Sequence, residues 1–284
     1  MTTFRRLLEE IKIEHTLFAL PFAYVGAVLA ARGVPSFHVL LWITLAVLGA
    51  RTAAMAANRL LDARQDARNP RTAQRFVASG RLPASTMVWC IVAGLVVLTV
   101  SAWQLNPLCL ALLPIGGVAV LLYPLVKRWT WAVHFVLGAV DGLAPLGAWI
   151  AVTGRFEAPA FVLFAAVTLW VAGFDILYAL MDREFDVREG IRSIPARFGP
   201  GASRALPALL HTLVVAALAL LGIIAGVHPL YWLGVLFAGV LLIYERRLIA
   251  RQDNLPALNV AVFNANMIFS IAFSLSTFAS VLTA

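Results

Sequence analysis

The sequence predicts an all-α fold, a polytopic membrane bundle of about nine transmembrane helices whose N-terminus lies in the cytoplasm. Three observations support this fold class: the composition, a series of long apolar stretches, and the distribution of basic residues between them. Of the 284 residues, 62% are hydrophobic and 13% are charged, and the mean hydropathy is +0.89. A soluble domain has roughly 45–50% apolar and about 25% charged residues. This composition excludes a secreted domain, a soluble dinucleotide-binding enzyme and a disordered chain.

Nine apolar stretches are each about long enough to cross a bilayer as a helix. They cover residues 15–32, 37–57, 86–104, 107–123, 132–153, 158–181, 204–226, 229–245 and 257–283. Turn and helix-cap signals separate them, at Gly33-Val34-Pro35-Ser36, Asn106-Pro107, Gly154, Gly199-Pro200-Gly201 and His228-Pro229. The alternating period of barrel strands is not found in them. Because little sequence lies outside these stretches, we expect residues 1–284 to form a single transmembrane domain.

The basic residues number 22 against 14 acidic residues, and their positions indicate the orientation of the chain. Cytoplasmic segments of membrane proteins carry an excess of Lys and Arg. With a cytoplasmic N-terminus, 19 of the 22 fall in inner segments, Arg32 and Arg155 fall in outer segments, and Arg51 lies within a stretch. Orientation thus explains most of the net charge of +8, and we expect no nucleic-acid partner. The two longest polar segments, 58–85 and 182–203, are expected on the same side.

Acidic residues recur at helical spacing at the start of both polar segments. Asn58, Asp62 and Asp66 are four residues apart, which places them on one face of a helix. The second segment repeats the pattern in Asp175-Ile-Leu-Tyr178-Ala-Leu-Met-Asp182-Arg-Glu-Phe-Asp186. Carboxylates at this spacing repel each other, so two such motifs on one side of the membrane favour a compensating cation. Carboxylate oxygens suit Mg²⁺, which also binds substrate phosphates; the alternative is that these are solvated helix ends offset by neighbouring Arg residues.

Basic side chains surround both motifs and point to an anionic ligand. They are Arg68, Arg71, Arg75 and Arg81 after the first motif, Arg188, Arg192 and Arg197 after the second, and Lys127, four residues after Tyr123, in a third inner segment. Carboxylate-bound metal surrounded by guanidinium and ammonium groups is suited to a diphosphate. For any single Arg, membrane orientation is an equally good explanation. A diphosphate at a membrane face beside an apolar bundle implies an amphiphile with a long hydrocarbon tail.

Arg51 lies seven residues before Asn58, which is about 10 Å deeper along a helix. An ionisable group at this depth is a functional candidate, because an unpaired charge in lipid is costly. Three interpretations remain open: Arg51 binds a carboxylate of the substrate, it pairs with Asp141 in the fifth stretch, or its side chain extends back to the interface.

These motifs resemble those of the UbiA-type intramembrane prenyltransferases. Asn58-Arg-Leu-Leu-Asp62-x-x-x-Asp66 is similar to the first aspartate motif of that family, and Tyr178-Ala-x-x-Asp182-x-x-x-Asp186 to the second. The similarity extends over the chain, through the stretches Glu14-His-Thr-Leu-Phe-Ala-Leu-Pro-Phe, Asn69-Pro-Arg-Thr-Ala and Gly190-Ile-Arg-Ser-Ile-Pro-Ala-Arg-Phe-Gly199. The resemblance implies a Mg²⁺-dependent polyprenyltransferase that alkylates the ring of an aromatic acid in respiratory quinone biosynthesis. It is closest to the branch that acts on 4-hydroxybenzoate, and a dihydroxynaphthoate precursor of menaquinone is the alternative acceptor.

The resemblance also implies roles for individual residues. Asn58, Asp62, Asp66, Asp182 and Asp186 would hold Mg²⁺ and the diphosphate, Lys127 and Arg71 would bind phosphate oxygens, Tyr123 and Tyr178 would shield an allylic cation, and Arg51 would hold the acceptor carboxylate. An aspartate or the released diphosphate would take the ring proton. For Asp141 the resemblance implies no role. The implied partners are a polyprenyl diphosphate, the aromatic acid and the lipid bilayer, in the inner membrane of a prokaryote or an organelle with the site on the cytoplasmic face.

Two other classes are compatible with an apolar chain that carries intramembrane charges. A transporter would use Arg51 and Asp141 along a substrate path, but the acidic motifs lie at stretch ends on one side, which does not suit alternating access. A lipid-headgroup phosphotransferase would need a different acidic motif, which the sequence lacks. The length of the prenyl chain is not predicted.

Overall fold

The computed structural model describes residues 3–11, 16–251 and 254–283. Lys12 and the Glu14-His15 part of the first motif-like stretch lie outside these ranges. The described residues contain helices and no strand, in the order α1 (Thr3–Glu10), α2 (Thr16–Ala31), α3 (Phe37–Asp66), α4 (Ala84–Leu105), α5 (Pro107–Leu122), η2 (Tyr123–Arg128), α6 (Val133–Thr153), α7 (Ala158–Ala179), η3 (Leu180–Asp182), α8 (Arg183–Glu189), α9 (Ile194–Ala225), α10 (Leu230–Arg251) and α11 (Leu255–Leu282). The all-α prediction is confirmed.

Each predicted stretch coincides with one long helix in the described part of the chain. Seven of these helices are long and apolar enough to cross a membrane, and α2 contains a shorter apolar segment. The chain is therefore an integral membrane protein. One helix runs further than predicted, since α10 ends at Arg251. Helix α9 is broken at Gly199, whose φ of 77° is not helical, so the predicted separator Gly199-Pro200-Gly201 divides a short first part from the long apolar part. The total of nine crossings and the side of the N-terminus stay predictions.

Three of the predicted separators contain helix caps. Ser36 accepts a hydrogen bond from the backbone N–H of Val39 at 3.3 Å at the start of α3, and Asn106 accepts one from Cys109 at 3.0 Å at the start of α5. Such side chains satisfy backbone groups that have no partner within the helix. Gly154 ends α6 in the left-handed conformation, with φ of 65°, which glycine adopts without steric cost.

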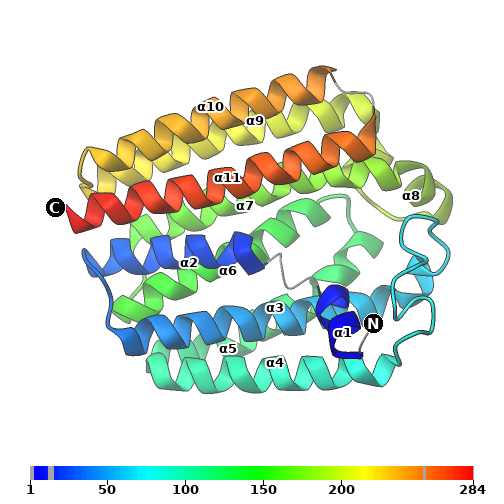
Figure 1. Ribbon diagram of the computed structural model, residues 1–284, viewed down its shortest axis with the longest axis horizontal. Coiled ribbons are helices and arrows are strands. Elements are labelled where there is room, and N and C mark those ends of the chain that lie inside the picture. Colours follow the sequence, from blue (N-terminus) through cyan, green and yellow to red (C-terminus); the bar gives the residue numbers. More distant parts are fainter. Residues whose placement is uncertain (1–2, 12–15, 252–253, 284) are drawn as a thin grey trace.

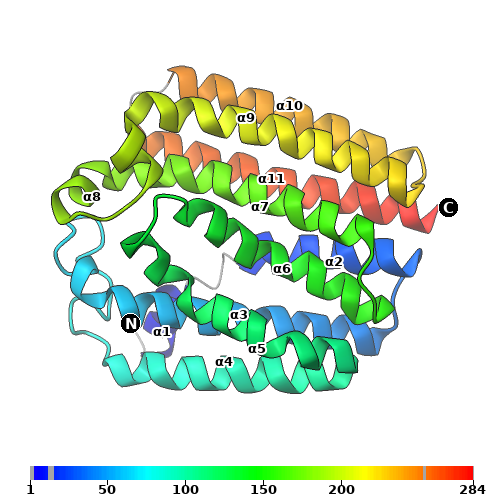
Figure 2. The same ribbon diagram turned by 180° about the vertical axis from the view of Figure 1, so that it is seen from behind.

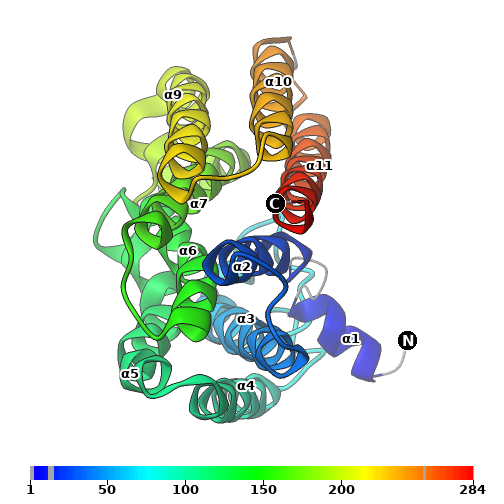
Figure 3. The ribbon, with the colours of Figure 1, turned by 90° about the vertical axis from the view of Figure 1, so that its left-hand side faces the viewer.

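The helices form two groups joined in the middle (Figure 1). The view along the bundle shows α9, α10, α7 and α11 on one side, α3, α4 and α5 on the other, and α2 and α6 between them (Figure 3). An aromatic cluster of Phe22, Trp170, Phe269 and Phe273 packs α2 against α7 and α11, with ring centroids 5.0–6.1 Å apart. The connection after α3 and helix α8 meet at one end of the bundle (Figures 1 and 2), so the two acidic motifs lie together.

Candidate active site

A polar cavity of about 250 Å³ lies at the end of the bundle where the connection after α3 meets α8. Eight of the ten predicted site residues line it: Asn58, Asp62, Asp66, Arg71, Tyr123, Lys127, Asp182 and Asp186. Helix α3 supplies the first motif, η2 supplies Tyr123 and Lys127, and η3 and α8 supply the second motif. Residues 62 and 186 are thus neighbours in space although more than a hundred residues separate them in sequence.

Asp62 is almost completely buried and lies against Lys127. The ammonium group of Lys127 donates to Asp62 Oδ2 at 2.6 Å, and the amide of Asn58 donates to the same oxygen at 3.2 Å. The other oxygen, Oδ1, is buried and has no hydrogen-bond partner in the part of the chain that the structure describes. A buried oxygen without a partner is rare in proteins and has capacity for a further ligand.

Asp66 lies one helical turn further along α3 and is paired with Arg75. One guanidinium nitrogen, Nη1 of Arg75, donates to both carboxylate oxygens at 2.8 and 2.7 Å. The hydroxyl of Thr72 donates to the backbone carbonyl of Asp66 at 3.1 Å. These contacts fold the connection after α3 back over the motif.

Asp182 joins the two polar segments. The amide of Asn69 and Nε of Arg71 each donate to Asp182 Oδ1 at 2.8 Å, and Nη2 of Arg71 donates to Oδ2. Burial alone would lower the pKa of Arg71, but hydrogen bonds to Asp182 and its negative charge outweigh burial and raise this pKa. Arg71 therefore remains a cation in contact with the second motif.

Asp186 accepts a hydrogen bond from the hydroxyl of Ser193 at 2.8 Å, and Ser193 also caps α9. Asp175 lies three turns earlier on the same acidic stripe and is 2.7 Å from Nδ1 of His134 on α6. The backbone N–H of Ile194 donates to the other nitrogen of His134 at 3.2 Å, which indicates that Nδ1 carries the proton and donates it to Asp175.

The other residues that line the cavity were not among the predicted site residues, and they include Asn69, Arg75, His134, Asp175 and Ser193. Asp175 shares the spacing of the second motif, and Arg75 belongs to the basic group after the first, so both could have been selected. Asn69 and Ser193 lie in two of the stretches that carry the family resemblance, so the sequence also pointed to them. His134 lies in none of these stretches, and the packing of α6 against α7 brings it to the site.

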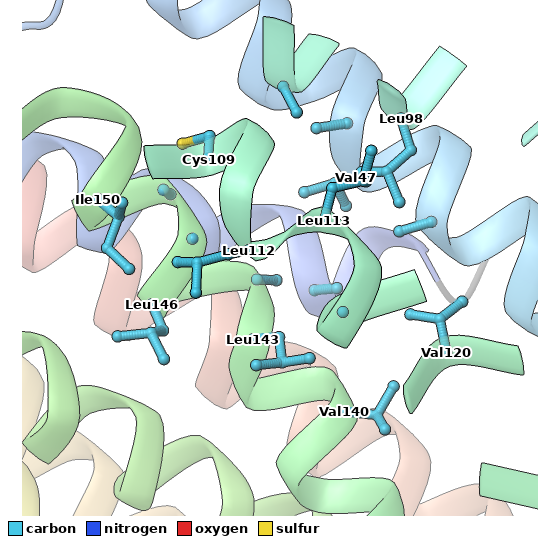
Figure 4. A pocket seen from close by; sticks show the side chains of 18 of the residues that line it. Val47, Leu98, Cys109, Leu112, Leu113, Val120, Val140, Leu143, Leu146 and Ile150 are labelled. Carbon is cyan, nitrogen blue, oxygen red and sulfur yellow. The ribbon is translucent and has the colours of Figure 1, made fainter. Parts of the chain in front are cut away.

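An apolar cavity of about 270 Å³ adjoins the polar one. Figure 4 shows its lining side chains, which come from α3, α4, α5 and α6 and include Val47, Leu98, Leu113 and Leu143. Tyr123 and Leu137 line both cavities, so the two spaces meet at these residues.

Arg51 lines the apolar cavity and pairs with Asp141. Its Nη1 donates to Asp141 Oδ1 at 2.8 Å, and the two side chains are 17% and 18% exposed. Of the three interpretations of Arg51, the structure shows the ion pair with Asp141; the role of Arg51 toward a substrate stays a prediction.

Tyr178 lines neither cavity, because its hydroxyl donates to the backbone carbonyl of Asn259 on α11 at 3.3 Å. Its predicted role as a cation shield also stays a prediction.

Glu10 of α1 anchors the connection that carries Arg71 and Arg75. Its buried carboxylate accepts hydrogen bonds from the backbone N–H groups of Phe76 and Val77 at 2.9 and 3.3 Å. Arg59 is also buried; its Nε donates to the backbone carbonyl of Glu10 at 3.0 Å and lies 3.9 Å from the carboxylate. The N-terminal helix is thus attached to the basic wall of the site.

The donor set of the polar cavity fits Mg²⁺ bound together with a phosphate group. Within the described residues, no three His, Cys, Asp or Glu side chains are grouped so that they could hold a metal ion alone. Mg²⁺ in such sites is usually bound by one or two carboxylates together with substrate phosphates. The buried Oδ1 of Asp62 has no protein partner, which matches this partial coordination.

The sequence model of the UbiA prenyltransferase family matches residues 19–270. The chain belongs to this family. The prediction from the aspartate motifs is therefore confirmed, and the enzyme class is that of the prenyltransferases.

Similar proteins within the family include the 4-hydroxybenzoate octaprenyltransferase of Marinobacter nauticus, which is 35% identical over 94% of this chain and 90% of its own length. A solved apo structure of a UbiA homologue from Aeropyrum pernix is 32% identical, covers 95% of this chain and 99% of its own, and has a TM-score of 0.86. A UbiA homologue from Archaeoglobus fulgidus, solved bound to GPP and Mg²⁺, has the same fold with a TM-score of 0.70 at 18% identity.

Proposed function

We propose that this UbiA family member transfers a polyprenyl group from a polyprenyl diphosphate to the ring of an aromatic acid, with 4-hydroxybenzoate as acceptor, in respiratory quinone biosynthesis. The observation that carries the proposal is the junction of the two cavities at Tyr123 and Leu137. A polar, charged space and an apolar space in contact suit a donor with a diphosphate head and a hydrocarbon tail. The relatives named as 4-hydroxybenzoate octaprenyltransferases support the choice of acceptor.

The polar cavity would hold the head of the donor. Arg71, Arg75 and Lys127, three of the basic residues that line this cavity, can contact phosphate oxygens, and guanidinium groups bind such oxygens with two parallel hydrogen bonds. Asp62, together with a carboxylate of the second motif such as Asp182, would hold Mg²⁺. When bound there, Mg²⁺ makes the diphosphate a better leaving group. The three cations stabilise the negative charge that develops on the diphosphate as the allylic C–O bond breaks.

The apolar cavity would hold the prenyl tail and keep water from the allylic cation. Its described lining is apolar apart from Arg51, Tyr123 and Asp141. Water would capture a carbocation before the ring could react, so a dry chamber is part of the chemistry. Tyr123 lies at the junction, where the face of its ring can stabilise a passing cation. Ile115 and Phe156 also line the cavity and are more than half exposed on the outer surface, which gives a long tail a route toward lipid.

The acceptor would enter beside the cation with its carboxylate on Arg51. In this position the ring carbon next to the hydroxyl would face the junction of the cavities. The ring proton that is replaced by the prenyl group would pass to a carboxylate such as Asp182 or to the released diphosphate. We further propose that the polar cavity faces the cytoplasm, in the inner membrane of a prokaryote or organelle, because most basic residues lie in the segments around it.

The function is tested by incubating purified protein in detergent or nanodiscs with a radiolabelled polyprenyl diphosphate and one acceptor at a time. The acceptors are 4-hydroxybenzoate, 1,4-dihydroxy-2-naphthoate and 1,4-dihydroxy-6-naphthoate, each with Mg²⁺ and with EDTA. The expected result is Mg²⁺-dependent prenylated 4-hydroxybenzoate. Product from a naphthoate instead would move the enzyme to menaquinone synthesis, and absence of any prenylated product would refute prenyl transfer.

A further inference from the structure

Arg51 and Asp141 are the only charged side chains among the described residues that line the apolar cavity. They come from different helices, α3 and α6, and form a direct ion pair of 2.8 Å. The described lining of the cavity thus contains one positive and one negative charge. The two charges cancel, so the cavity carries no net charge. On the proposed function, however, it binds an anionic acceptor.

The pair is explained by the surroundings of Arg51. An unpaired guanidinium among membrane helices is strongly unfavourable, and intramembrane charges are almost always paired. Asp141 supplies the missing negative charge. It leaves Arg51 incompletely satisfied, because a guanidinium has five N–H donors and Nε of Arg51 is buried without a hydrogen-bond partner in the described chain.

Arg51 can therefore bind a second carboxylate, but Asp141 already occupies part of its guanidinium group. Two carboxylates on one guanidinium repel each other, and the repulsion is stronger in an apolar cavity than in water. The acceptor must either share Arg51 at this cost or displace Asp141 from it.

We propose that Asp141 is the resident counter-ion of Arg51, that the acceptor carboxylate competes with it, and that Asp141 thereby sets the affinity and charge selectivity of the acceptor site. The proposal rests on the proposed function, in which Arg51 binds the acceptor carboxylate. Asp141 is then a specificity-determining residue that need not touch the reacting atoms. The prenylated product keeps its carboxylate, so the return of Asp141 to Arg51 also assists product release.

The main test is Asp141→Asn, which keeps the shape and one oxygen for Arg51 Nη1 but removes the competing charge. The KM for 4-hydroxybenzoate is expected to fall at least about fivefold, on the scale of couplings between close charges, while the KM for the prenyl diphosphate stays within about twofold. The KM for the uncharged 4-hydroxybenzamide should not change. An unchanged or increased KM for 4-hydroxybenzoate would overturn the proposal.

Thermal stability gives a readout that does not depend on turnover. Asp141→Asn leaves Arg51 uncompensated, so 4-hydroxybenzoate should raise the Tm of the variant more than that of the wild type. Glu157→Gln is the matched control, because Glu157 lines neither cavity and is hydrogen-bonded by Trp149 of α6 at 2.9 Å. This control should leave the KM for each acceptor and the acceptor-induced shift in Tm as in the wild type.

The wild-type enzyme provides an independent arm if Asp141→Asn does not fold. Because Arg51 is already compensated, 4-hydroxybenzoate should bind less than about tenfold more tightly than 4-hydroxybenzamide; a preference of about a hundredfold would contradict the proposal. If the wild type prenylates none of the acceptors, the proposed function fails first. If the wild type prenylates an acceptor but the KM test on Asp141→Asn and the wild-type binding comparison both fail, only the role of Asp141 is refuted.

Discussion

Asp62 and Asp182 occupy different surroundings although each holds a central place in its motif. Asp62 is buried in α3 with one oxygen on Lys127 and the other without a described partner. Asp182 lies in η3 and is held by Asn69 and Arg71 from the facing segment. The first aspartate is therefore better placed to take a further ligand, and the second holds the two walls of the cavity together.

We expect Asp62→Asn and Asp182→Asn each to reduce the rate of prenyl transfer 100-fold or more, on the order of 3 kcal/mol in the activation free energy. An amide is a weaker ligand for Mg²⁺ than a carboxylate and lacks the charge that holds the basic partner. Single-turnover rates with saturating donor and acceptor measure the effect. Wild-type turnover in either variant would contradict the assignment of the motif.

Arg51→Ala is expected to raise the KM for 4-hydroxybenzoate by roughly 10- to 100-fold, since a hydrogen bond to a charged group contributes about 1.5–3 kcal/mol. The KM for the prenyl diphosphate should hardly change, which makes it an internal control. Arg51→Lys should cause a smaller rise, because it keeps the charge and loses the two-pronged geometry. If the acceptor KM of Arg51→Ala equals that of the wild type, Arg51 has no role in acceptor binding.

At this scale the sequence locates the acids and several basic residues near them, but not which partner each acid has. Spacing along one helix is visible in the sequence, so Asn58, Asp62 and Asp66 were assigned to one face. Which Arg meets which Asp depends on how the connection after α3 folds, and no periodic pattern encodes it. The pairing of Arg75 with Asp66 and the presence of His134 beside Asp175 therefore required the structure.

At the scale of elements, the N-terminal helix α1 and the connection after α3 act together. The carboxylate of Glu10 accepts hydrogen bonds from two backbone N–H groups of that connection, and Arg59 of α3 donates to the backbone carbonyl of Glu10. The basic residues that would face the diphosphate lie only a few positions earlier, at Arg71 and Arg75. The geometry of the donor site thus depends on a residue that does not touch the donor.

Glu10→Ala is expected to raise the KM for the prenyl diphosphate about tenfold, because the connection with Arg71 and Arg75 loses its anchor. Breaking the buried contact with Arg59 should also cost about 3–5 kcal/mol of stability. Glu9→Gln is the control, since Glu9 is exposed and its ion pair among the described residues is with Arg5; exposed pairs contribute little. Donor and acceptor KM values are measured side by side, and an effect confined to the acceptor would contradict this role.

The helices were largely predictable because length and composition alone define an apolar helix, and Gly, Pro and Asn mark the ends. The departures occur where a helix continues into polar sequence. Ser193 caps a short first part of α9, which ends at the kink at Gly199, and the long apolar part begins after this kink. The role of α1 was not predictable, since its partner backbone lies more than sixty residues away.

At the scale of the whole molecule, close approach between helices depends on glycine. A Cβ at Gly94 of α4 would lie 2.6 Å from the backbone oxygen of Gly49 on α3, and one at Gly49 would lie 2.7 Å from the oxygen of Gly94. Small residues let membrane helices approach closely, which is a main source of their association. This contact holds α4 against the helix that carries the first motif.

Gly94→Leu should therefore separate α4 from α3 and destabilise the protein by about 1–3 kcal/mol. Gly117→Leu in α5 is the control, because a Cβ at Gly117 meets no atom within 4 Å. Thermal unfolding in detergent compares the two variants with the wild type. If Gly94→Leu and Gly117→Leu are equally stable, the close contact between α3 and α4 does not contribute to the stability of the protein.

The pairing of acids with bases in the polar cavity also determines how its ligands are captured. Lys127 and Arg71 suit phosphate oxygens, and their partners Asp62 and Asp182 suit a divalent cation. A diphosphate and its cation that arrive together exchange these internal pairs for external ones, and the net charge of the site changes little. Either one alone must break a pair and leave a charge uncompensated. On the proposed function, we therefore expect their binding to be positively cooperative, with each increasing the affinity for the other by the same factor.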